Sequence, residues 1–347
     1  MILLRKLLFP FAILYGFITS VRNYLYDKGI LKSYSFDIPV IAVGNLSVGG
    51  TGKTPQIEYL IRLLSPNYKV ATLSRGYKRQ SEGFILADAN ANAEILGDEP
   101  FQYFQKFPQI QVAVDADRRN GISQLLSQKE KPEIILLDDA FQHRKVKAGF
   151  YILLTSYGDL FCDDYILPTG NLRESRNGAK RANVIIVTKC PSNLSDIEQE
   201  EISRKLMRFL VPRNDNAKVI FFSFVEYDDK VYNQNGSLEV ADIKSQEKLL
   251  LAGIAKPKPF FDELQSGNDM VMEFPDHHHF SDSDILDIKN KANHKIIVTT
   301  EKDFVRLEAE IFAAQLYYLP IKSKLLRDSG TFDQTILDYV GTRTGNR

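Results

Sequence analysis

Short apolar runs alternate with segments of helical spacing through most of the chain. One such segment places Ile57, Leu60, Ile61 and Leu64 on a single face, as an amphipathic helix requires. Apolar runs of four or five residues are typical of strands that are buried on both faces of a parallel sheet. The strands expected in the first half are residues 40–43, 69–73, 111–114, 134–137, 151–154 and 183–187. The pattern therefore predicts an α/β fold built on a parallel sheet.

The pattern changes near residue 214. The composition becomes polar around residues 214–217, and the runs 219–225 and 231–232 flank a polar turn that includes Asn235 and Gly236, a pair typical of β-hairpins. A second α/β unit follows, with strands expected at residues 249–252, 295–299 and 315–319. We therefore expect a larger domain over residues 26–215 and a smaller α/β domain over residues 216–347. A β-hairpin-type linker would join them, so that the smaller domain can close over a cleft.

The first 25 residues form a separate apolar segment. A signal peptide would need a small-residue cleavage site, and none follows before the first expected strand. The run 7–20 is shorter than the ~20 residues of a spanning helix, and it contains Pro10 and Gly16. We favour a membrane-associated interfacial helix whose basic neighbours meet anionic headgroups; these are Arg5, Lys6, Arg22 and Lys28. A buried first helix stays open, because periodicity does not separate the two.

A glycine loop lies between the first expected strand and the helix that contains Ile57. In such a loop, backbone N–H groups converge on an anion at a helix N-terminus, a lysine reaches the outer phosphates and a hydroxyl can bind Mg²⁺. The strict pattern has a glycine where this chain has Ser47. A glycine-rich turn without a ligand is the alternative, but the strand and helix on either side favour a P-loop NTPase-like domain. The residues expected to bind a nucleoside triphosphate are Ser47, Gly49, Gly50, Thr51, Gly52, Lys53 and Thr54.

Charged residues follow several of the expected strands, where open α/β sheets bind their ligands. Asp138 and Asp139 follow the run 134–137 and offer the hard oxygen ligands that Mg²⁺ prefers. Because adjacent strand residues face opposite ways, we expect one of them to face the metal directly. Thr188 and Lys189 form a candidate nucleobase contact, or a surface turn. The basic candidates for an anionic substrate are Arg75, which also fits a solvated turn, and Arg118, Arg119 and Arg173.

Two further segments suggest proton transfer. Asp98 opens an expected helix in the motif G-D-E-P, where helix capping alone is a sufficient explanation. Three consecutive histidines, His277 to His279, follow Asp276. Their side chains diverge and no other histidine lies at ligand spacing, so a zinc site is discounted. An aspartate beside a histidine in a turn is better suited to handling a proton.

Composition narrows the function classes. The 347 residues are 44% apolar and 25% charged, enough for two domains with their own cores. Lys plus Arg and Asp plus Glu both number 44, so no global field favours nucleic acid as a partner. Cys162 and Cys190 stand far apart, which indicates neither a disulfide framework nor a zinc site and fits a reducing cytoplasm.

Taken together, the motifs resemble a known family. They are G-N-L-S-V-G-G-T-G-K-T-P, L-S-R-G-Y, G-D-E-P, D-A-D-R-R, L-D-D-A-F-Q-H-R, L-P-x-G-x-L-R-E, F-P-D-H-H and T-T-E-K-D, in this order. The set resembles the tetraacyldisaccharide 4'-kinase (lipid A 4'-kinase) family from the apolar N-terminus to about residue 307. That family's loop tolerates a hydroxyl residue at the position of Ser47. The resemblance implies transfer of phosphate from ATP to the 4'-hydroxyl of a tetraacyldisaccharide 1-phosphate, a precursor in lipid A and lipopolysaccharide biosynthesis, by a peripheral enzyme on the cytoplasmic face of the bacterial inner membrane.

The resemblance also implies roles for single residues. Asp98 matches the acidic catalytic residue, and His277 matches the histidine of the D-H motif, with His278 as the alternative partner of Asp98. The other matches are Lys53 and Thr54 to the phosphate loop, Asp138 and Asp139 to the metal-associated pair, and His143 to the histidine that follows it. We expect Lys53 and Mg²⁺ to neutralise the β- and γ-phosphate oxygens, and Asp98 to accept the proton of the sugar hydroxyl.

One rival function belongs to a different class. A membrane-associated P-loop ATPase or GTPase switch that acts on a protein partner would use the same loop. Such a switch needs no acid–base pair, whereas this chain presents Asp98 and Asp276-His277. The sequence therefore favours a kinase and indicates no obligate protein partner.

Overall fold

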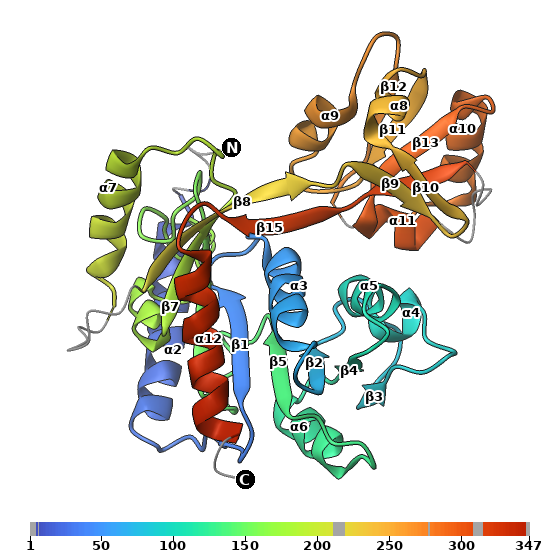
Figure 1. Ribbon diagram of the computed structural model, residues 1–347. Coiled ribbons are helices and arrows are strands. Elements are labelled where there is room, and N and C mark those ends of the chain that lie inside the picture. Colours follow the sequence, from blue (N-terminus) through green and yellow to red (C-terminus); the bar gives the residue numbers. More distant parts are fainter. Residues whose placement is uncertain (1–4, 6, 211–218, 277, 308–314, 345–347) are drawn as a thin grey trace.

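The computed structural model describes residues 5, 7–210, 219–276, 278–307 and 315–344. Its helices are α2 (Phe9–Asp27), α3 (Lys53–Leu64), α4 (Ala93–Leu96), α5 (Asp98–Lys106), α6 (Arg118–Ser127), α7 (Asp196–Met207), α8 (Val240–Lys244), α9 (Lys258–Leu264), α10 (Asp282–Ala292), α11 (Glu301–Leu307) and α12 (Ser329–Thr344), with a 3₁₀ helix η1 at Arg176–Arg181. Its strands are β1 (Val40–Asn45), β2 (Val70–Ser74), β3 (Ile85–Leu86), β4 (Gln111–Val114), β5 (Ile134–Asp138), β6 (Phe150–Ser156), β7 (Val184–Thr188), β8 (Ile220–Tyr227), β9 (Lys230–Asn233), β10 (Gly236–Glu239), β11 (Lys248–Ala252), β12 (Met270–Glu273), β13 (Ile296–Thr300), β14 (Leu316–Leu319) and β15 (Ile321–Leu325). These elements form two bodies (Figure 1).

The larger body is built on a nine-stranded sheet in the order β15-β8-β7-β6-β1-β5-β2-β4-β3. Its seven inner strands from β8 to β4 run parallel, and β15 and β3 pair antiparallel at the edges. All six residues of the central strand β1 are buried, which is why its sequence is an apolar run without alternation. Helices α3, α5 and α12 cover one face of the sheet, and α6 and α7 cover the other. The expected α/β fold with a parallel sheet is confirmed.

The smaller body has a six-stranded sheet in the order β10-β9-β14-β13-β11-β12. Helices α8 and α9 lie in the core on one face, with Val240, Phe260 and Leu264 buried between them and the sheet. Helices α10 and α11 cover the other face through Ile285, Ile288 and other side chains. The second α/β unit expected after residue 216 is therefore present.

The end of the chain does not stay in the smaller body. Strand β15 pairs antiparallel with β8, and α12 packs Phe332, Ile336 and Val340 into the core of the larger body. Figure 1 shows β8 and β15 as a two-stranded ribbon between the bodies, with α12 beside β1. The expected boundary of 216–347 therefore differs from the structure, because the apolar face of α12 is buried only against the large sheet.

The linker also differs from the expected β-hairpin. The turn at Asn235 and Gly236 belongs to the pair β9–β10 inside the smaller body, where Asn233 pairs with Gly236. Two strands far apart in the chain, β8 and β15, join the bodies instead. Pairing between residues 220–227 and 321–325 is not local, so no short turn motif marks it in the sequence.

Helix α2 leaves most of its apolar side chains exposed. It buries Ala12 and Gly16, whereas Leu14 is 58% exposed and Phe17 is 65% exposed. The alternative of a buried first helix is therefore wrong. None of the helices in the described part of the chain is long and apolar enough to cross a membrane. The interfacial helix stays a prediction.

Candidate active site

The glycine loop joins β1 to α3 at the carboxyl edge of the large sheet. Gly49 has φ 111° and Gly52 has φ 81°, left-handed conformations that favour glycine. Gly52 directly precedes Lys53, the first residue of α3, and no side chain caps the helix. An uncapped helix N-terminus behind a glycine loop is a favourable site for a phosphate group.

Thr188, the last residue of β7, and Lys189, which follows it, contact the loop itself. The hydroxyl of Thr188 donates to the carbonyl of Thr51 at 2.8 Å, and the amine of Lys189 donates to the carbonyl of Gly50 at 2.6 Å. Burial lowers the pKa of Lys189, and the nearby charges of Lys256 and Lys53 act in the same direction. The structure thus shows these two residues holding the backbone of the loop. Sequence reasoning suggested a nucleobase contact or a surface turn for them and missed this role.

Asp138 lies beside the start of the loop. The register of the sheet pairs it with Val43 of β1, and its Oδ2 accepts from the hydroxyls of Tyr103 (3.3 Å) and Ser74 (3.4 Å). Burial raises the pKa of Asp138 to about 6, although the positive charge of Lys53 lowers it. Within the described residues, its buried Oδ1 has no hydrogen-bond partner.

Asp139 points to a different set of groups. Its carboxylate accepts from Arg173 at 3.0 and 3.1 Å and lies 3.7 Å from the amine of Lys53. Burial opposes ionisation, but Lys53 and Arg173 outweigh it and lower the pKa of Asp139. Its positive φ of 47° turns the chain away from the strand. The two aspartates therefore diverge, as expected for adjacent residues at a strand end.

The donor set around Asp138 fits Mg²⁺. The free Oδ1 of Asp138 is a hard oxygen donor, and the hydroxyl of Thr54 is within hydrogen-bonding reach of Tyr103, which also contacts Asp138. Among the described residues, no cluster of three or more His, Cys, Asp or Glu side chains could hold a metal. Mg²⁺ in nucleotide sites uses few protein ligands besides phosphate and water, so a carboxylate and a hydroxyl are sufficient.

The four candidate arginines lie in different environments. Arg75 is exposed after β2, and Arg173 pairs with Asp139. Arg118 is 2% exposed and donates to the carbonyls of Asp115 and Asp138; burial lowers its pKa to about 10. Arg119 lies over the ring of Tyr34 at 3.8 Å. Arg118 therefore braces the strand ends, and Arg119 packs on an aromatic ring.

His143 is a half-buried side chain after β5. Burial lowers its pKa to about 4, with a further contribution from the charge of Arg118. Its backbone N–H donates to the carbonyl of Ala140 at 3.0 Å. At neutral pH the imidazole is therefore uncharged, which favours a hydrogen-bonding role over a contact of charge with phosphate.

Asp98 is the first residue of α5, and Gly97 before it has φ 89°. Its carboxylate binds Arg306 of α11, which donates through Nε (3.1 Å) and Nη2. The next residue, Glu99, is near enough to Asp138 for its charge to raise the pKa of that group. The start of α5 therefore adjoins the strand end that carries Asp138. Sequence reasoning missed Arg306, although its i,i+3 spacing from Asp303 in T-T-E-K-D-F-V-R was a signal.

His277 lies outside the described residues, but its neighbours are tied to α11. Arg306 donates to the carbonyl of His278 at 3.4 Å, and Lys302 donates to Asp276 at 3.1 Å. The ring of His278 lies 3.1 Å from Asp284 at the start of α10. The segment around the histidines is thus held to the helix that contacts Asp98, whereas His278 itself is paired within the smaller body.

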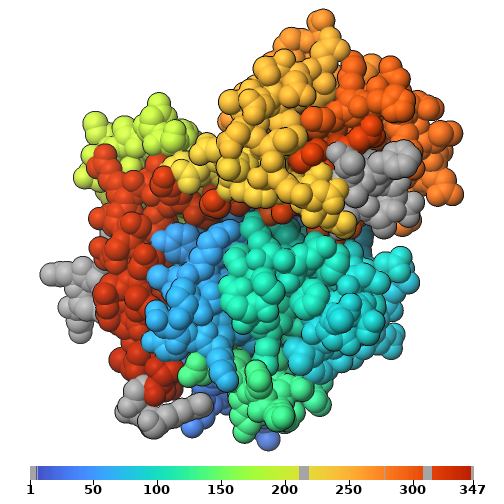
Figure 2. Space-filling view, turned by 45° about the vertical axis from the view of Figure 1, so that its right-hand side comes forward, coloured from blue at the N-terminus to red at the C-terminus, as the bar shows by residue number. Residues whose placement is uncertain are grey.

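Helices α5 and α11 also meet through a buried charge cluster. Lys106 lies 2.8 Å from Glu58 of α3 and 2.6 Å from Glu301 of α11. Burial raises the pKa of Glu301 to about 7, and the charge of Glu58 adds to the effect. Figure 2 shows the smaller body seated against α3 and α5. The two bodies therefore touch beside the candidate site, and the contact is made largely of charged groups.

An apolar cavity of about 600 Å³ lies between α2 and the segment 164–177. Its lining includes Phe9, Ile13 and Phe17 from the helix and Ile166 and Leu172 from the segment. The same segment is held by the helix through polar contacts: Tyr15 donates to the carbonyl of Arg173 (3.0 Å), and Asn23 donates to Glu174 (2.5 Å). Arg173 in turn pairs with Asp139, which lies near Lys53. A chain of side-chain contacts therefore links α2 to the phosphate loop.

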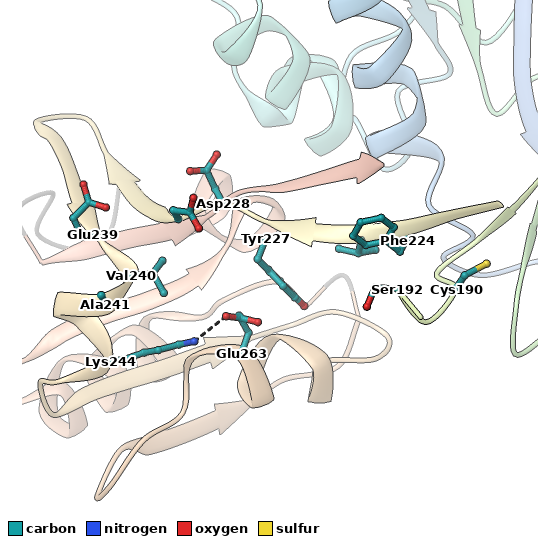
Figure 3. Close-up of a pocket in the computed structure, with 12 residues that line it drawn as sticks. Cys190, Ser192, Phe224, Tyr227, Asp228, Glu239, Val240, Ala241, Lys244 and Glu263 are labelled. Atoms are coloured by element: carbon teal, nitrogen blue, oxygen red, sulfur yellow. Dashed lines mark hydrogen bonds and ion pairs between the residues drawn. The ribbon is translucent and has the colours of Figure 1, made fainter. Parts of the chain in front are cut away.

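A second cavity, of about 540 Å³, lies beside the linker (Figure 3). Its lining includes Asp228, Asp229, Glu239 and Glu263, and Lys244 pairs with Glu263 at 2.8 Å. Tyr227 points from β8 towards α9 in this view. Because its carboxylates repel a polyphosphate, and no residue of the glycine loop lines it, this cavity is distinct from the candidate phosphate site.

Three comparisons relate the whole chain to known proteins. The family model of the tetraacyldisaccharide-1-P 4'-kinases matches residues 4–341. The tetraacyldisaccharide 4'-kinase of Flavobacterium johnsoniae is 67% identical over 97% of this chain and 98% of that protein, and that of Bacteroides thetaiotaomicron is 46% identical over 99% and 95%. A crystal structure of LpxK from Aquifex aeolicus, described as an "apo" form in complex with ATP, is similar with a TM-score of 0.77 and 32% identity, over 97% of this chain and 99% of that one.

Proposed function

The chain belongs to the tetraacyldisaccharide-1-P 4'-kinase family, and on that premise we propose how its residues perform the reaction. It is an ATP-dependent kinase whose acceptor is the 4'-hydroxyl of a tetraacyldisaccharide 1-phosphate, a lipid A precursor. The observation that carries the site assignment is the convergence of the glycine loop, Asp138 and the start of α5 at one edge of the large sheet.

The triphosphate of ATP lies over the loop from Ser47 to Thr54. The N-terminus of α3 supplies positive potential to the phosphates, and Lys53 supplies a full charge at its first residue. Asp139 and Arg173 position the amine of Lys53 before ATP arrives. Thr54 and Oδ1 of Asp138 would hold Mg²⁺, which when bound neutralises charge on the phosphate oxygens.

Asp98 is the base of the reaction. As the 4'-oxygen forms its bond to the γ-phosphorus, the bond from that phosphorus to the bridging oxygen breaks and ADP leaves with the electron pair. Asp98 takes the hydroxyl proton, and His277 assists it. Catalysis then depends mainly on the positions of the sugar hydroxyl and the γ-phosphate and on neutralisation of the phosphate charge.

The acyl chains need an apolar surface near this edge. The cavity between α2 and residues 164–177 and the exposed face of α2 supply one. We place α2 in the interface of the cytoplasmic leaflet of the inner membrane, with its apolar side chains among lipid tails. The loop of Arg173 then lies between the lipid surface and Asp139.

Incubation with ATP labelled on its γ-phosphate and purified tetraacyldisaccharide 1-phosphate tests this function. Label should enter the lipid and should survive mild acid, which removes the glycosidic 1-phosphate and leaves a 4'-phosphate ester. Lipid that lacks a free 4'-hydroxyl is the matched control and should stay unlabelled. Release of free phosphate that requires an added protein, with no labelled lipid, would support the switch and contradict the kinase.

A further inference from the structure

Arg306 makes a contact that neither the phosphate loop nor the metal-binding residues require. It lies on α11 of the smaller body, and its guanidinium donates through Nε (3.1 Å) and Nη2 to one oxygen of Asp98 on α5 of the larger body. Both side chains are mostly buried, with 12% and 19% exposure. The contact therefore joins the proposed base to the smaller body.

The smaller body holds this guanidinium in place. Oδ1 of Asp303 lies 3.6 Å from Nη1 of Arg306, and Oδ2 of Asp303 accepts from the N–H of Gly253 (2.8 Å) and the hydroxyl of Thr300 (2.7 Å). Nη1 also donates to the carbonyl of His278. The fork of Arg306 is thus anchored to β13, to the turn after β11 and to the histidine segment, and an anchored fork orients its carboxylate partner.

The charge on Arg306 has a chemical consequence for Asp98. A cation in contact with a carboxylate lowers its pKa by about 1–3, and a carboxylate must be ionised before it can accept a proton. Among the described residues, the other charged groups near this pair include Lys302 and Asp303 of α11 and Glu99 of α5. Gly76, next to Arg75, lies against Gly97 from the loop after β2. Arg306 is a cation in direct contact with the Asp98 carboxylate.

We propose that Arg306 is a positioning residue for phosphoryl transfer, which keeps Asp98 ionised and oriented when the two bodies meet. Arg306 lies on α11, so Asp98 gains this partner when the smaller body contacts α5. Contact between the two bodies and ionisation of the base therefore occur together. The inference rests on the assignment of Asp98 as the base in the proposed function. It also gives the motif T-T-E-K-D-F-V-R a physical role, because Asp303 and Arg306 lie one helical turn apart on α11.

The test is the pH dependence of kcat/KM for the lipid, at saturating ATP, in variants at position 306. Arg306→Gln and Arg306→Met remove the charge and should move the acid limb of the profile upward by about 1–3 pH units. Near neutral pH Asp98 stays ionised in these variants, so the fall in kcat, by at least about 10-fold, comes from the lost orientation of the base, with a KM for the lipid within about 3-fold of the parent. Arg306→Lys keeps the charge without the fork; its limb should stay in place while kcat falls.

Arg327→Met is the matched control, because Arg327 pairs with Asp196 at 2.5 Å in an exposed position away from the cleft and such pairs contribute little. Its profile should coincide with that of the parent. Thermal melts of each variant establish that it is folded at the assay temperature. Arg306→Gln and Arg306→Met each give an independent measurement of the pH at which kcat/KM falls on the acid side. A uniform loss of activity at every pH, with no movement of the limb, would overturn the inference and leave Arg306 with a structural role.

Asp98→Asn separates this inference from the function on which it rests. Loss of transfer in Asp98→Asn, together with an unmoved acid limb in both neutral variants of Arg306, would keep Asp98 as the base and reject Arg306 as its positioning residue. Near-normal transfer in Asp98→Asn would reject the base itself, whatever the variants of Arg306 show.

Discussion

Glu301→Gln should remove a large part of the pH dependence of stability. Glu301 is 8% exposed and lies 2.6 Å from Lys106, which also contacts Glu58, itself 1% exposed. Burial is the main reason that the pKa of Glu301 rises from 4.5 to about 7. Two buried carboxylates thus share one ammonium group, so ionisation of the second is unfavourable.

The sign and size of the effect follow from linkage. A folded pKa above the unfolded value gives stability that is complete below pH ~4.5 and is lost as pH rises through about 7. A shift from 4.5 to about 7, at 1.36 kcal/mol per pH unit, corresponds to a loss on the order of 3 kcal/mol. Glutamine mimics the neutral acid at every pH, so Glu301→Gln should match the parent near pH 4.5 and exceed its stability at pH 8.5.

Urea unfolding followed by far-UV circular dichroism measures the difference at the two pH values; the chain has no tryptophan, so circular dichroism is the more direct probe. Glu247→Gln is the matched control. Glu247 is exposed, and its hydrogen bond and ion pair with Lys295 lower its pKa, so its contribution should change far less than that of Glu301 between pH 4.5 and pH 8.5. A stability difference between Glu301→Gln and the parent that stays constant over this range would refute the reasoning.

Three further predictions concern the site and the membrane face. Lys53→Ala should lower kcat for transfer by at least about 10²-fold through loss of charge neutralisation, with a smaller effect on lipid binding; near-normal kcat would remove the phosphate-loop argument. The double substitution Leu14→Asp and Phe17→Asp should reduce co-sedimentation with anionic vesicles. The control Ile197→Asp, at an exposed apolar residue of α7, should not. Equal vesicle binding by the double variant and the control would exclude α2 as the membrane contact. Asp98→Ala and His277→Ala should be strongly non-additive on kcat, and additive losses would separate the two residues.

The sequence predicted best those features that depend on neighbouring residues. The strands at 40–43, 111–114 and 249–252 lie within β1, β4 and β11 or coincide with them, because runs that are buried on both faces carry a strong local signal. The glycine loop followed by Lys53 was visible for the same reason. The divergence of Asp138 and Asp139 followed from strand geometry alone.

Features that depend on distant contacts were missed. The return of β15 and α12 to the large sheet joins residues about a hundred positions apart, and nothing in residues 316–344 alone reveals which sheet they cover. Arg118 was a candidate for the substrate, yet it is buried against backbone carbonyls. Arg306 was not a candidate, because its partner Asp98 lies 208 positions away and only the packing of α11 on α5 brings them together.

Single-turnover transfer by Asp98→Asn tests the central claim most directly, since asparagine keeps the size of the side chain but cannot accept the proton. With enzyme in excess over labelled ATP and saturating tetraacyldisaccharide 1-phosphate, the rate of label transfer should fall by about 10²–10⁴-fold, while the dissociation constants for ATP and lipid stay within about 3-fold of the parent. A transfer rate close to that of the parent would show that Asp98 is not the base. It would also contradict the proposed role of Arg306 as its positioning residue.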